Sequence, residues 1–344
     1  MKIKNYSIDH DSPVFIIAEL SANHNGSIAT ALETVKAAKR AGADCIKLQT
    51  YRADTITIDS KKDDFLIKGT IWEGRNLFEL YEEAYTPWEW HETLFKAAEA
   101  EGLVCFSSPF DPTSVELLES LNAPAYKIAS FEITDIPLIE LVASKGKPVI
   151  ISTGIAEEAD IELALDACKR MGNNDIALLK CTSSYPAPIE EANMIMVAAM
   201  AEKYGVITGL SDHTIGSTVP VVATCFGAKI IEKHFILDRS IGGPDASFSM
   251  NEAEFTAMVR AVREAEAAIG RVDYTLTDKQ RKGKDFSRSL YVVEDIKAGD
   301  VITEANVRSI RPGYGLHPKH YREILGKKAN RDLERGERFS LDFL

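Results

Sequence analysis

One pattern recurs eight times along the chain: a short apolar run ends in polar residues, and an amphipathic stretch follows. The runs are rich in Ile, Val, Ala and Cys, which is typical of strands buried on both faces of a parallel sheet. The polar residues that close them are, in chain order, Glu19, Lys47 and Gln49, Ser107 and Ser108, Lys127, Ser130 and Glu132, Ser152 and Thr153, Lys180, Thr182 and Tyr185, Ser211 and His213, and Glu232 and His234. Eight such units predict an α/β fold of the (β/α)8 TIM-barrel class, in which the carboxyl ends of all strands meet at one mouth.

The stretches between the apolar runs carry helix signatures. Residues 27–40 have an amphipathic pattern that begins at a serine and ends just before a glycine. Thr86 and Asp111 each precede a proline, which suits the first turn of a helix, so we expect both residues to begin helices. Residues 251–269 form a long, Ala-rich amphipathic pattern, which predicts the helix that closes the barrel.

Changes in composition divide the chain into parts. Residues 1–270 contain the eight units and are predicted to form the barrel domain, and residues 271–285 are predicted to be a polar linker. Residues 286–344 show short strand patterns and turns but are few for an independent core, so this domain should pack against the barrel or a partner subunit. The segment 54–85 is longer than an ordinary connection in a barrel, which makes it a candidate lid over the mouth.

The composition is that of a soluble globular protein, with 45% hydrophobic and 27% charged residues among 344. No apolar run reaches the roughly 18 residues that a membrane span needs, and the N-terminus lacks the apolar region of a secretory signal. The five cysteines are scattered, three of them in strand patterns (Cys45, Cys105 and Cys181) and two in helical patterns (Cys168 and Cys225), so we expect reduced core thiols and a cytoplasmic protein. A net charge of -12 argues against non-specific nucleic-acid binding.

Lysines at the strand ends make the mouth of this acidic protein locally positive, which indicates a small anionic ligand. They are Lys47, Lys127, Lys180 and Lys233. The alternative is that some of them form a structural charge network with Glu19, Glu132 or Glu232. We expect that alternative for Lys180 and Lys233, because strand side chains alternate between two faces and not all can point into the mouth.

The strongest candidates for metal ligands are two histidines that follow neighbouring predicted strands, His213 and His234. Neutral imidazoles suit a divalent ion such as Mn, Fe, Co or Zn, although two hydrogen-bonding core histidines would show the same pattern. Glu19 and Glu232 favour the metal site, because carboxylates nearby would complete the coordination, orient a ligand or handle a proton. His24, shortly after the first strand, is a further candidate for a place at the mouth.

Lys127 with Ser130, and Ser107 with Ser108 on the preceding strand end, form a candidate oxyanion or phosphate site. The lysine supplies charge and the hydroxyl groups supply directed hydrogen bonds. The alternative is that Ser108 or Ser130 only begins the helix that follows. The chain has no glycine-rich nucleotide-binding motif, so nucleotide binding is not expected.

Two further loops carry polar residues that bear on function. Asp245 follows the eighth strand in a Gly-Gly-Pro-Asp turn, where it either contacts a substrate or stabilises the turn. Arg311 lies at the tip of a Pro- and Gly-rich loop in the C-terminal domain. Such a loop is often only a turn, but it would supply a wall of the site if the small domain covers a barrel mouth.

Nine motifs, in order along nearly the whole chain, resemble those of the nonulosonic acid synthases, the sialic acid synthase family. They are IAELSANHNG (17–26), KLQT (47–50), SSPFD (107–111), YKIASFEI (126–133), CTSSYPAP (181–188), LSDHT (210–214), EKHF (232–235), GGPDASFSM (242–250) and SIRPGYGLHP (309–318). The resemblance implies a TIM barrel followed by a C-terminal antifreeze-like SAF domain of the β-clip type. It also implies a domain-swapped homodimer in which each SAF domain caps the barrel of its partner.

The family resemblance implies a transferase that condenses phosphoenolpyruvate with an open-chain N-acetylated amino-sugar aldehyde, releasing phosphate with cleavage of a C–O bond. By resemblance, His213 and His234 hold a divalent cation, Mn or else Mg or Co, that polarises the aldehyde oxygen. The residues implied in catalysis are Glu19, Lys47, Lys127, Tyr185 and Arg311. The residues implied in substrate binding are Gln49, Ser108, Phe110, Ser130, Glu132, Ser183, Ser211, Glu232 and Asp245. Family members often carry Asn where this chain has Ser183.

The loop SIRPGYGLHP resembles the branch of the family that makes pseudaminic acid, whereas sialic acid synthases commonly read RPGNG there. Tyr314 and His317 are bulkier than their counterparts, which would suit a 6-deoxy diacetamido sugar, 2,4-diacetamido-2,4,6-trideoxy-L-altrose. The alternatives are an N-acetylneuraminic or legionaminic acid synthase and a metal-dependent aldolase or 3-deoxy-heptulosonate-type synthase, which lacks a SAF domain. An inactive sugar-binding protein is a third alternative, disfavoured because the candidate site residues are all present.

Overall fold

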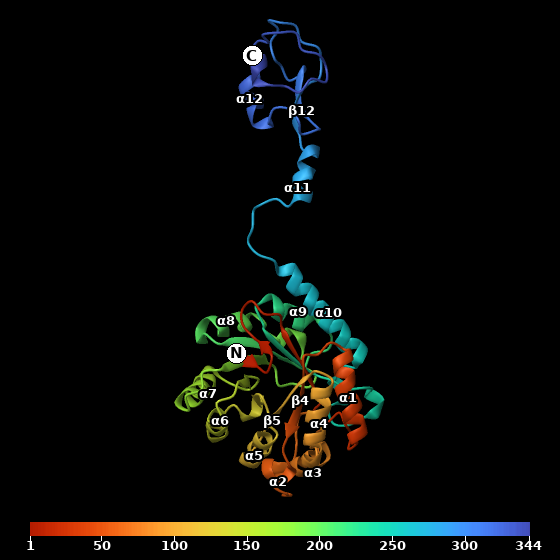
Figure 1. Ribbon diagram of the computed structural model, residues 1–344, viewed down its shortest axis with the longest axis vertical. Helices are drawn as coiled ribbons and strands as arrows, with labels where there is room; N and C mark the ends of the chain where they lie inside the picture. The colour runs from red at the N-terminus through yellow and green to blue at the C-terminus, as the bar shows by residue number, and fades with distance from the viewer. The chain divides into compact units, whose positions relative to one another are not determined.

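The computed structural model describes residues 1–344 and divides them into two compact units, residues 1–270 and residues 271–344. In the first unit, eight parallel strands close into a barrel surrounded by helices, which confirms the predicted fold (Figure 1). The strands are β3 (Phe15–Glu19), β4 (Cys45–Thr50), β5 (Val104–Pro109), β6 (Tyr126–Ile128), β7 (Val149–Ser152), β8 (Ile176–Cys181), β9 (Ile207–Asp212) and β10 (Ile230–His234). They neighbour one another in chain order, and β10 pairs with β3 to complete the closure.

The principal helices of the barrel unit follow the strands. They are α1 (Ile28–Arg40), α3 (Leu77–Ala84), α4 (Trp88–Ala100), α5 (Pro112–Ser120), α6 (Ile136–Ala143), α7 (Glu158–Arg170), α8 (Ile195–Tyr204), α9 (Thr218–Cys225) and α10 (Glu252–Ile269). The expected caps of α1 and α5 are present, because Ser27 accepts a hydrogen bond from Thr30 N and Asp111 accepts one from Thr113 N. The long helix α10 begins after Asn251, which caps it in the same way.

The start of α4 differs from the prediction. The helix begins at Trp88 with Pro87 at the cap position, and no side chain caps it. Thr86 lies before the helix, and its hydroxyl oxygen is 3.3 Å from Nε2 of His24. The threonine therefore joins the loop after β3 to α4, a tertiary contact that the local pattern does not encode.

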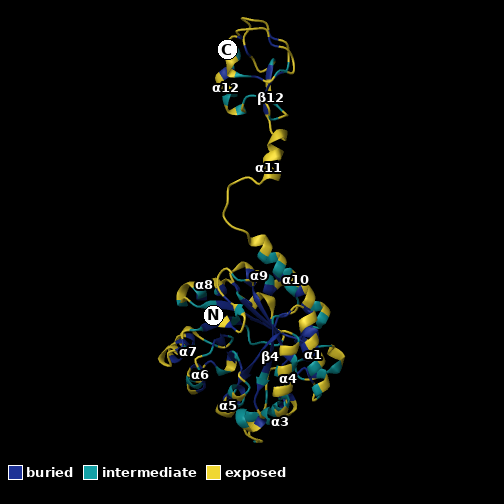
Figure 2. Cartoon of the chain, in the orientation of Figure 1, coloured by how far each residue is buried: buried dark blue, intermediate teal, exposed yellow.

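The interior of the barrel changes character along its axis. Toward the amino ends of the strands, inward side chains such as Phe15, Phe106 and Leu179 form an apolar cluster with Ile3 and Ile8. The latter two belong to the segment around the short N-terminal hairpin of β1 (Lys2–Ile3) and β2 (Tyr6–Ser7). Toward the carboxyl ends, the inward positions carry charged and polar groups instead. Figure 2 shows the strands as a buried centre within the partly exposed ring of helices.

All five cysteines are free thiols. Cys45, Cys105, Cys168 and Cys181 are buried, as predicted, whereas Cys225 is exposed on α9. Cys225 lies in a helix as expected, but the prediction of a core thiol was wrong for it, because α9 turns one side toward solvent and Cys225 lies on that side.

The second unit has its own small core. The antiparallel strands β11 (Ser289–Val292) and β12 (Val307–Ile310) and the short helix α12 (Tyr321–Ile324) contribute to it. Leu290, Ile296 and Phe339 are among its buried residues. The interval predicted as a linker contains a short helix, α11 (Asp278–Gly283), all of whose residues are exposed. No helix in either unit combines the length and the apolar character needed to cross a membrane.

Candidate active site

A cavity of about 440 Å³ lies at the mouth of the barrel. Side chains from strand ends and the following loops line it, together with part of the segment between β4 and α4, the candidate lid. Of the sequence candidates, the lining includes Glu19, Lys47, Gln49, Phe110, Lys127, Ser130, Glu132, Tyr185, Ser211, His213, Glu232, His234 and Asp245. Residues distant along the chain therefore meet around one space, as the carboxyl ends of barrel strands are expected to do.

A buried charge network forms the floor of this cavity. The strand register pairs Glu19 with Lys47 on one side and with His234 on the other. Nζ of Lys47 lies 2.9 Å from Oε1 of Glu19 and 3.0 Å from Oε1 of Glu232. Nζ of Lys127 lies 3.5 Å from the same oxygen of Glu232. One carboxylate oxygen thus lies between two buried ammonium groups, while the other, Oε2 of Glu232, is buried without a hydrogen-bond partner.

Burial and pairing move the pKa values of these groups in different directions. Burial would raise the pKa of Glu19, but Lys47 holds that pKa well below its ordinary value. Burial would likewise lower the pKa of Lys47, but Glu19 and Glu232 raise it. For Lys127, burial prevails over the nearby carboxylates and lowers the pKa. Burial also raises the pKa of Glu132 to about 7, so this carboxyl group exchanges a proton near neutral pH.

The two candidate metal ligands lie together. The ring centroids of His213 and His234 are 5.4 Å apart, with 56° between the planes. Nδ1 of His213 is 3.0 Å from the carbonyl oxygen of Thr182, which leaves Nε2 for a ligand. Nδ1 of His234 is buried without a hydrogen-bond partner. No three His, Cys, Asp or Glu side chains are grouped to hold a metal ion, so the pair fits a cation only with water or substrate oxygens as further ligands.

Hydroxyl groups from two strand ends converge beside Gly154, in the loop after β7. A Cβ atom at Gly154 would lie 2.1 Å from Oγ of Ser183 and 2.6 Å from Oγ of Ser130. The backbone N–H of Gly154 donates a hydrogen bond to Oγ of Ser130 at 3.1 Å. The missing side chain therefore makes room for a pair of hydroxyl groups, of which Ser130 lines the same cavity as Lys127, an arrangement suited to an anion.

The capping alternative for the serines is wrong. The cap of α5 is Asp111, three residues after Ser108. Ser130 is the first residue of a 3-10 turn that extends to Glu132, and Ala129 occupies the cap position. Both serines are buried, so their hydroxyl groups are available for interactions other than a helix start.

Three predicted site residues do not line the cavity: Ser108, Ser183 and Arg311. The hydroxyl group of Ser108 is buried without a hydrogen-bond partner. Ser183 is next to the cavity through its approach to Gly154. Arg311 belongs to the second unit, where it is exposed on the loop after β12.

The two lysines assigned to a structural role do not line the cavity, but their partners differ from the prediction. Nζ of Lys233 is 2.5 Å from Oδ2 of Asp212 and also donates to the carbonyl oxygen of Thr214. Nζ of Lys180 donates to the carbonyl oxygen of Cys181 at 2.7 Å. Neither lysine pairs with a glutamate of the mouth, because both side chains leave the sheet on its outer face.

His24 is not part of the cavity lining either. Its Nδ1 accepts a hydrogen bond from the backbone N–H of Gly26 at 3.1 Å, and its Nε2 faces the Thr86 hydroxyl group. Burial lowers the pKa of His24 to about 4. The ring is a neutral structural element of the loop after β3.

The cavity lining also contains residues that the sequence candidates did not include, among them Ser21, Tyr51 and Trp72. The hydroxyl group of Ser21 donates a hydrogen bond to Oδ2 of Asp245. Ser21 and Tyr51 each lie two residues after a predicted inward residue, so extending the strand alternation past the strand end would have found them. Trp72 lies in the long segment between β4 and α4, and no local signal marks it.

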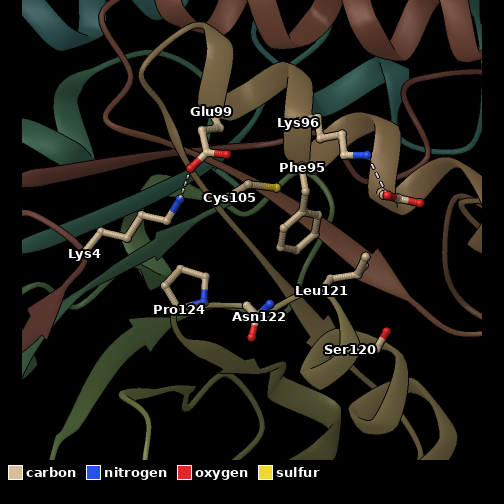
Figure 3. A pocket seen from close by; sticks show the side chains of 10 residues that line it. Lys4, Phe95, Lys96, Glu99, Cys105, Ser120, Leu121, Asn122 and Pro124 are labelled. Atoms are coloured by element: carbon tan, nitrogen blue, oxygen red, sulfur yellow. Dashed lines mark hydrogen bonds and ion pairs between the residues drawn. The ribbon is translucent and has the colours of Figure 1, made fainter.

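A second cavity, of about 470 Å³, lies near the amino ends of β5 and β6. Figure 3 shows that each of its two lysines is joined to a carboxylate: Nζ of Lys4 is 3.4 Å from Glu99, and Nζ of Lys96 is 2.6 Å from Glu92. Burial raises the pKa of the Cys105 thiol at the wall of this cavity, so the thiol stays protonated. Because its charges are already paired, this cavity lacks the unpartnered buried groups that distinguish the mouth.

Comparison with known proteins identifies the family. A model of the NeuB family matches residues 34–274, more than half of the chain. The chain belongs to the NeuB family. A model of the SAF domain matches residues 287–344, within the second unit. The fold predicted for both parts of the chain is therefore confirmed.

Relatives of this NeuB family member are named for their products. The chain is 50% identical over 337 residues to pseudaminic acid synthase of Campylobacter jejuni strain 81-176, covering 98% of each chain. It is 49% identical over 331 residues to pseudaminic acid synthase of Helicobacter pylori, covering 96% of this chain and 97% of the relative. The crystal structure of N-acetylneuraminic acid synthetase from Leptospira borgpetersenii superposes with a TM-score of 0.73 at 29% identity, covering 82% of this chain and 94% of the other.

Proposed function

We propose that this NeuB family member is a pseudaminic acid synthase. It condenses phosphoenolpyruvate with the open-chain aldehyde of 2,4-diacetamido-2,4,6-trideoxy-L-altrose and releases phosphate with C–O cleavage. The observation that carries the proposal is identity of about half the residues, over almost the entire chain, to pseudaminic acid synthases from two genera. The geometry of the mouth supports it, because the site combines two buried lysines with a histidine pair.

The two lysines of the floor mark the proposed site of phosphoenolpyruvate. Lys47 and Lys127 are buried and face one shared oxygen of Glu232. The hydroxyl pair of Ser130 and Ser183 beside Gly154 supplies directed donors, and Ser130 lines the same cavity as Lys127. An anion bound there would gain charge-assisted hydrogen bonds in surroundings that exclude water, where such bonds are strong.

The proposed cofactor is a divalent cation, Mn or else Mg or Co, held by His213 and His234. The fit rests on the closeness of the two rings and on the buried ring nitrogen of His234 that has no hydrogen-bond partner. A cation bound there supplies Lewis acidity to the oxygen of the aldehyde. Water and the substrate would complete its coordination, since the protein offers no third ligand in this group.

The protein side chains then act on charge and protons during the condensation. C3 of phosphoenolpyruvate bonds to the aldehyde carbon, which leaves positive charge at C2 beside the carboxyl groups of Glu19 and Glu232. Water adds to C2 and gives up one proton, which balances the proton that the former aldehyde oxygen takes up to become a hydroxyl group. The second proton of the water goes to the phosphate as the C2–O bond breaks and a keto group remains. Burial raises the pKa of the Tyr185 hydroxyl, so this residue remains a hydrogen-bond donor. Glu132, with a pKa of about 7, is placed to hold or pass a proton.

The second unit is proposed to complete the site from a partner subunit in a domain-swapped homodimer. Arg311, exposed on its loop, would reach the acetamido side of the sugar in the partner's barrel. An exposed apolar rim on the loops after β6, β7, β8 and β9 supports a docked partner. Its members are Phe131, Ile155, Ile189 and Ile215. The cytoplasm is the proposed location, because phosphoenolpyruvate is an intracellular metabolite.

Isotope labelling combined with sugar competition tests the proposal. Phosphoenolpyruvate labelled with ¹⁸O at the oxygen that bridges C2 and phosphorus should deliver the label to phosphate, because the C–O bond breaks. Phosphate release should be fastest with the 6-deoxy diacetamido altrose, compared with N-acetylmannosamine and with the legionaminic acid precursor. Retention of the label in the sugar product would exclude the mechanism, and preference for either other sugar would assign the chain to that branch instead.

A further inference from the structure

The cavity at the mouth has two unlike sides. The floor carries the charged groups, which stand on the strands themselves. Another part of the lining is apolar and aromatic, and most of it comes from the segment between β4 and α4. Its residues are Tyr51, Trp72, Leu77, Leu80, Tyr81 and Phe110. A site of this kind matches a ligand with one anionic or polar end and one apolar end.

Trp72 links this segment to the loop after β10. Its indole N–H donates a hydrogen bond to the carbonyl oxygen of Pro244, in the loop after β10, at 3.1 Å. Its ring lies 5.6 Å from the ring of Tyr185 and 6.4 Å from the ring of Phe248, measured between centroids. The ring of Tyr185 in turn is 4.4 Å from that of His213. The hydrogen bond and the aromatic contacts fix the orientation of the indole at the cavity wall.

We infer that Trp72 determines acceptor specificity, by forming an apolar wall that selects a sugar with a methyl group in place of a hydroxymethyl group at C6. The inference rests on the proposed function and names the part of the acceptor that the wall recognises. Nothing in the local sequence points to Trp72, because its role depends on a contact with a loop 172 residues away along the chain.

The direction of the acceptor follows from the reaction. Its aldehyde carbon must meet C3 of phosphoenolpyruvate, and the proposed place of that anion is the floor, near Lys47 and Lys127. The other end of the open chain must then point away from the floor, toward the segment between β4 and α4. Trp72 and its apolar neighbours are what that end meets.

The wall discriminates through desolvation. A methyl group packs against an indole face without losing hydrogen bonds, whereas a hydroxyl group there would give up its bonds to water. The indole N–H cannot compensate, because Pro244 already accepts its hydrogen bond. Apolar pockets reject an added hydroxyl group only moderately, so we expect a preference of about tenfold to a hundredfold.

A matched pair of acceptors tests the inference. The first is 2,4-diacetamido-2,4,6-trideoxy-L-altrose, and the second differs from it only by a hydroxyl group at C6. The full-length protein should show a kcat/KM about tenfold or more higher for the first. Trp72→Ala and Trp72→Gln should reduce that preference to about twofold or less, mainly through KM for the sugar, with KM for phosphoenolpyruvate nearly unchanged. Trp72→Phe keeps an aromatic face and should keep most of the preference.

Ile71→Ala is the matched control, because Ile71 is the exposed neighbour of Trp72 and does not line the cavity. It should keep the preference of the unaltered protein. Equal kcat/KM for the two acceptors in the unaltered protein, or an unchanged preference in both Trp72→Ala and Trp72→Gln, overturns the inference. If Trp72→Ala fails to fold, Trp72→Gln decides. Failure of the unaltered protein to use either acceptor is a different result, which overturns the proposed function itself.

Discussion

Gly154, after β7, leaves the space that the hydroxyl group of Ser183, after β8, occupies: a Cβ atom at Gly154 would lie 2.1 Å from Oγ of Ser183. The same atom would lie 2.6 Å from Oγ of Ser130, whose position is also held by the N–H of Gly154. The positions of two hydroxyl groups, from the strand ends on either side of β7, thus depend on one residue without a side chain. The geometry of the proposed phosphoenolpyruvate site is therefore sensitive to the smallest possible addition.

We predict that Gly154→Ala raises KM for phosphoenolpyruvate by roughly tenfold to a hundredfold. The reason is that the displaced hydroxyl groups would no longer be oriented to donate hydrogen bonds to the anion. Steady-state kinetics with each substrate varied separately measures the effect. Adding Ser183→Ala to the variant removes the nearest clash and should restore part of the affinity. Gly283→Ala is the control, since nothing lies within 4 Å of a Cβ atom there. An unchanged KM in Gly154→Ala would refute the proposed anion site.

We predict that Glu232→Gln destabilises the protein by about 3 kcal/mol. The reason is that Lys47 and Lys127 both face Oε1 of Glu232 and would remain buried without that shared charge. Phosphoenolpyruvate should recover part of the loss, because its negative charge would lie between the same ammonium groups. Urea unfolding with and without phosphoenolpyruvate measures both effects. Equal stabilisation of the variant and the unaltered protein by phosphoenolpyruvate would contradict binding at the lysines.

The carboxyl group of Glu132 should make stability fall with rising pH. Burial raises its pKa from the ordinary 4.5 to about 7, so between these values the folded protein holds a proton that the unfolded chain has released. Its contribution to stability is fully present below pH 4.5 and lost as the pH rises through 7. Glu132→Gln stays neutral, so its stability relative to the unaltered protein should increase from pH 5 to pH 8.

Urea unfolding at several pH values measures this difference. Glu116→Gln, at an exposed position on α5, is the control and should run parallel to the unaltered protein. Parallel curves for Glu132→Gln as well would show that the Glu132 carboxyl group is ionised in the folded protein throughout the range.

Removal of divalent cations should abolish turnover without unfolding the barrel, and Mn²⁺ should restore it. A second measurement does not depend on activity: Mn²⁺ should raise the Tm of the metal-free protein, and the double variant His213→Ala/His234→Ala should lose that response. His10→Ala, at an exposed position, should respond like the unaltered protein. A Tm increase that survives in the double variant would locate the cation elsewhere.

Ser289 should act as a positioning residue for Arg311. Its hydroxyl group donates to the carbonyl oxygen of Pro312 at 2.6 Å and accepts from the N–H of Gly315 at 2.9 Å, so it ties both sides of the loop. Arg311→Ala should lower kcat/KM for the sugar by about a hundredfold, and Ser289→Ala by about tenfold, with unchanged barrel folding. Arg308→Ala, exposed on β12, is the control. Full activity of Arg311→Ala would show that the second unit does not contribute Arg311 to the proposed site.

Local sequence patterns were sufficient for the elements but not for every contact. The starts of α1 and α5 were predicted because Ser27 and Asp111 act on backbone groups only two or three residues away. The start of α4 was misplaced because Thr86 has its partner in the loop after β3. The structural lysines Lys180 and Lys233 were recognised by strand alternation, but their partners were not, since pairing depends on the neighbouring strand.

The sequence by itself determined the barrel, the second domain and the set of strand ends that carry chemistry, because strand and helix periodicity repeats within a few residues and the strand ends of a barrel must converge. Only the tertiary structure decided which groups touch. The register set Glu19 between Lys47 and His234, and the path of a long segment brought Trp72 to Pro244. Such contacts join residues far apart along the chain, so no local period encodes them.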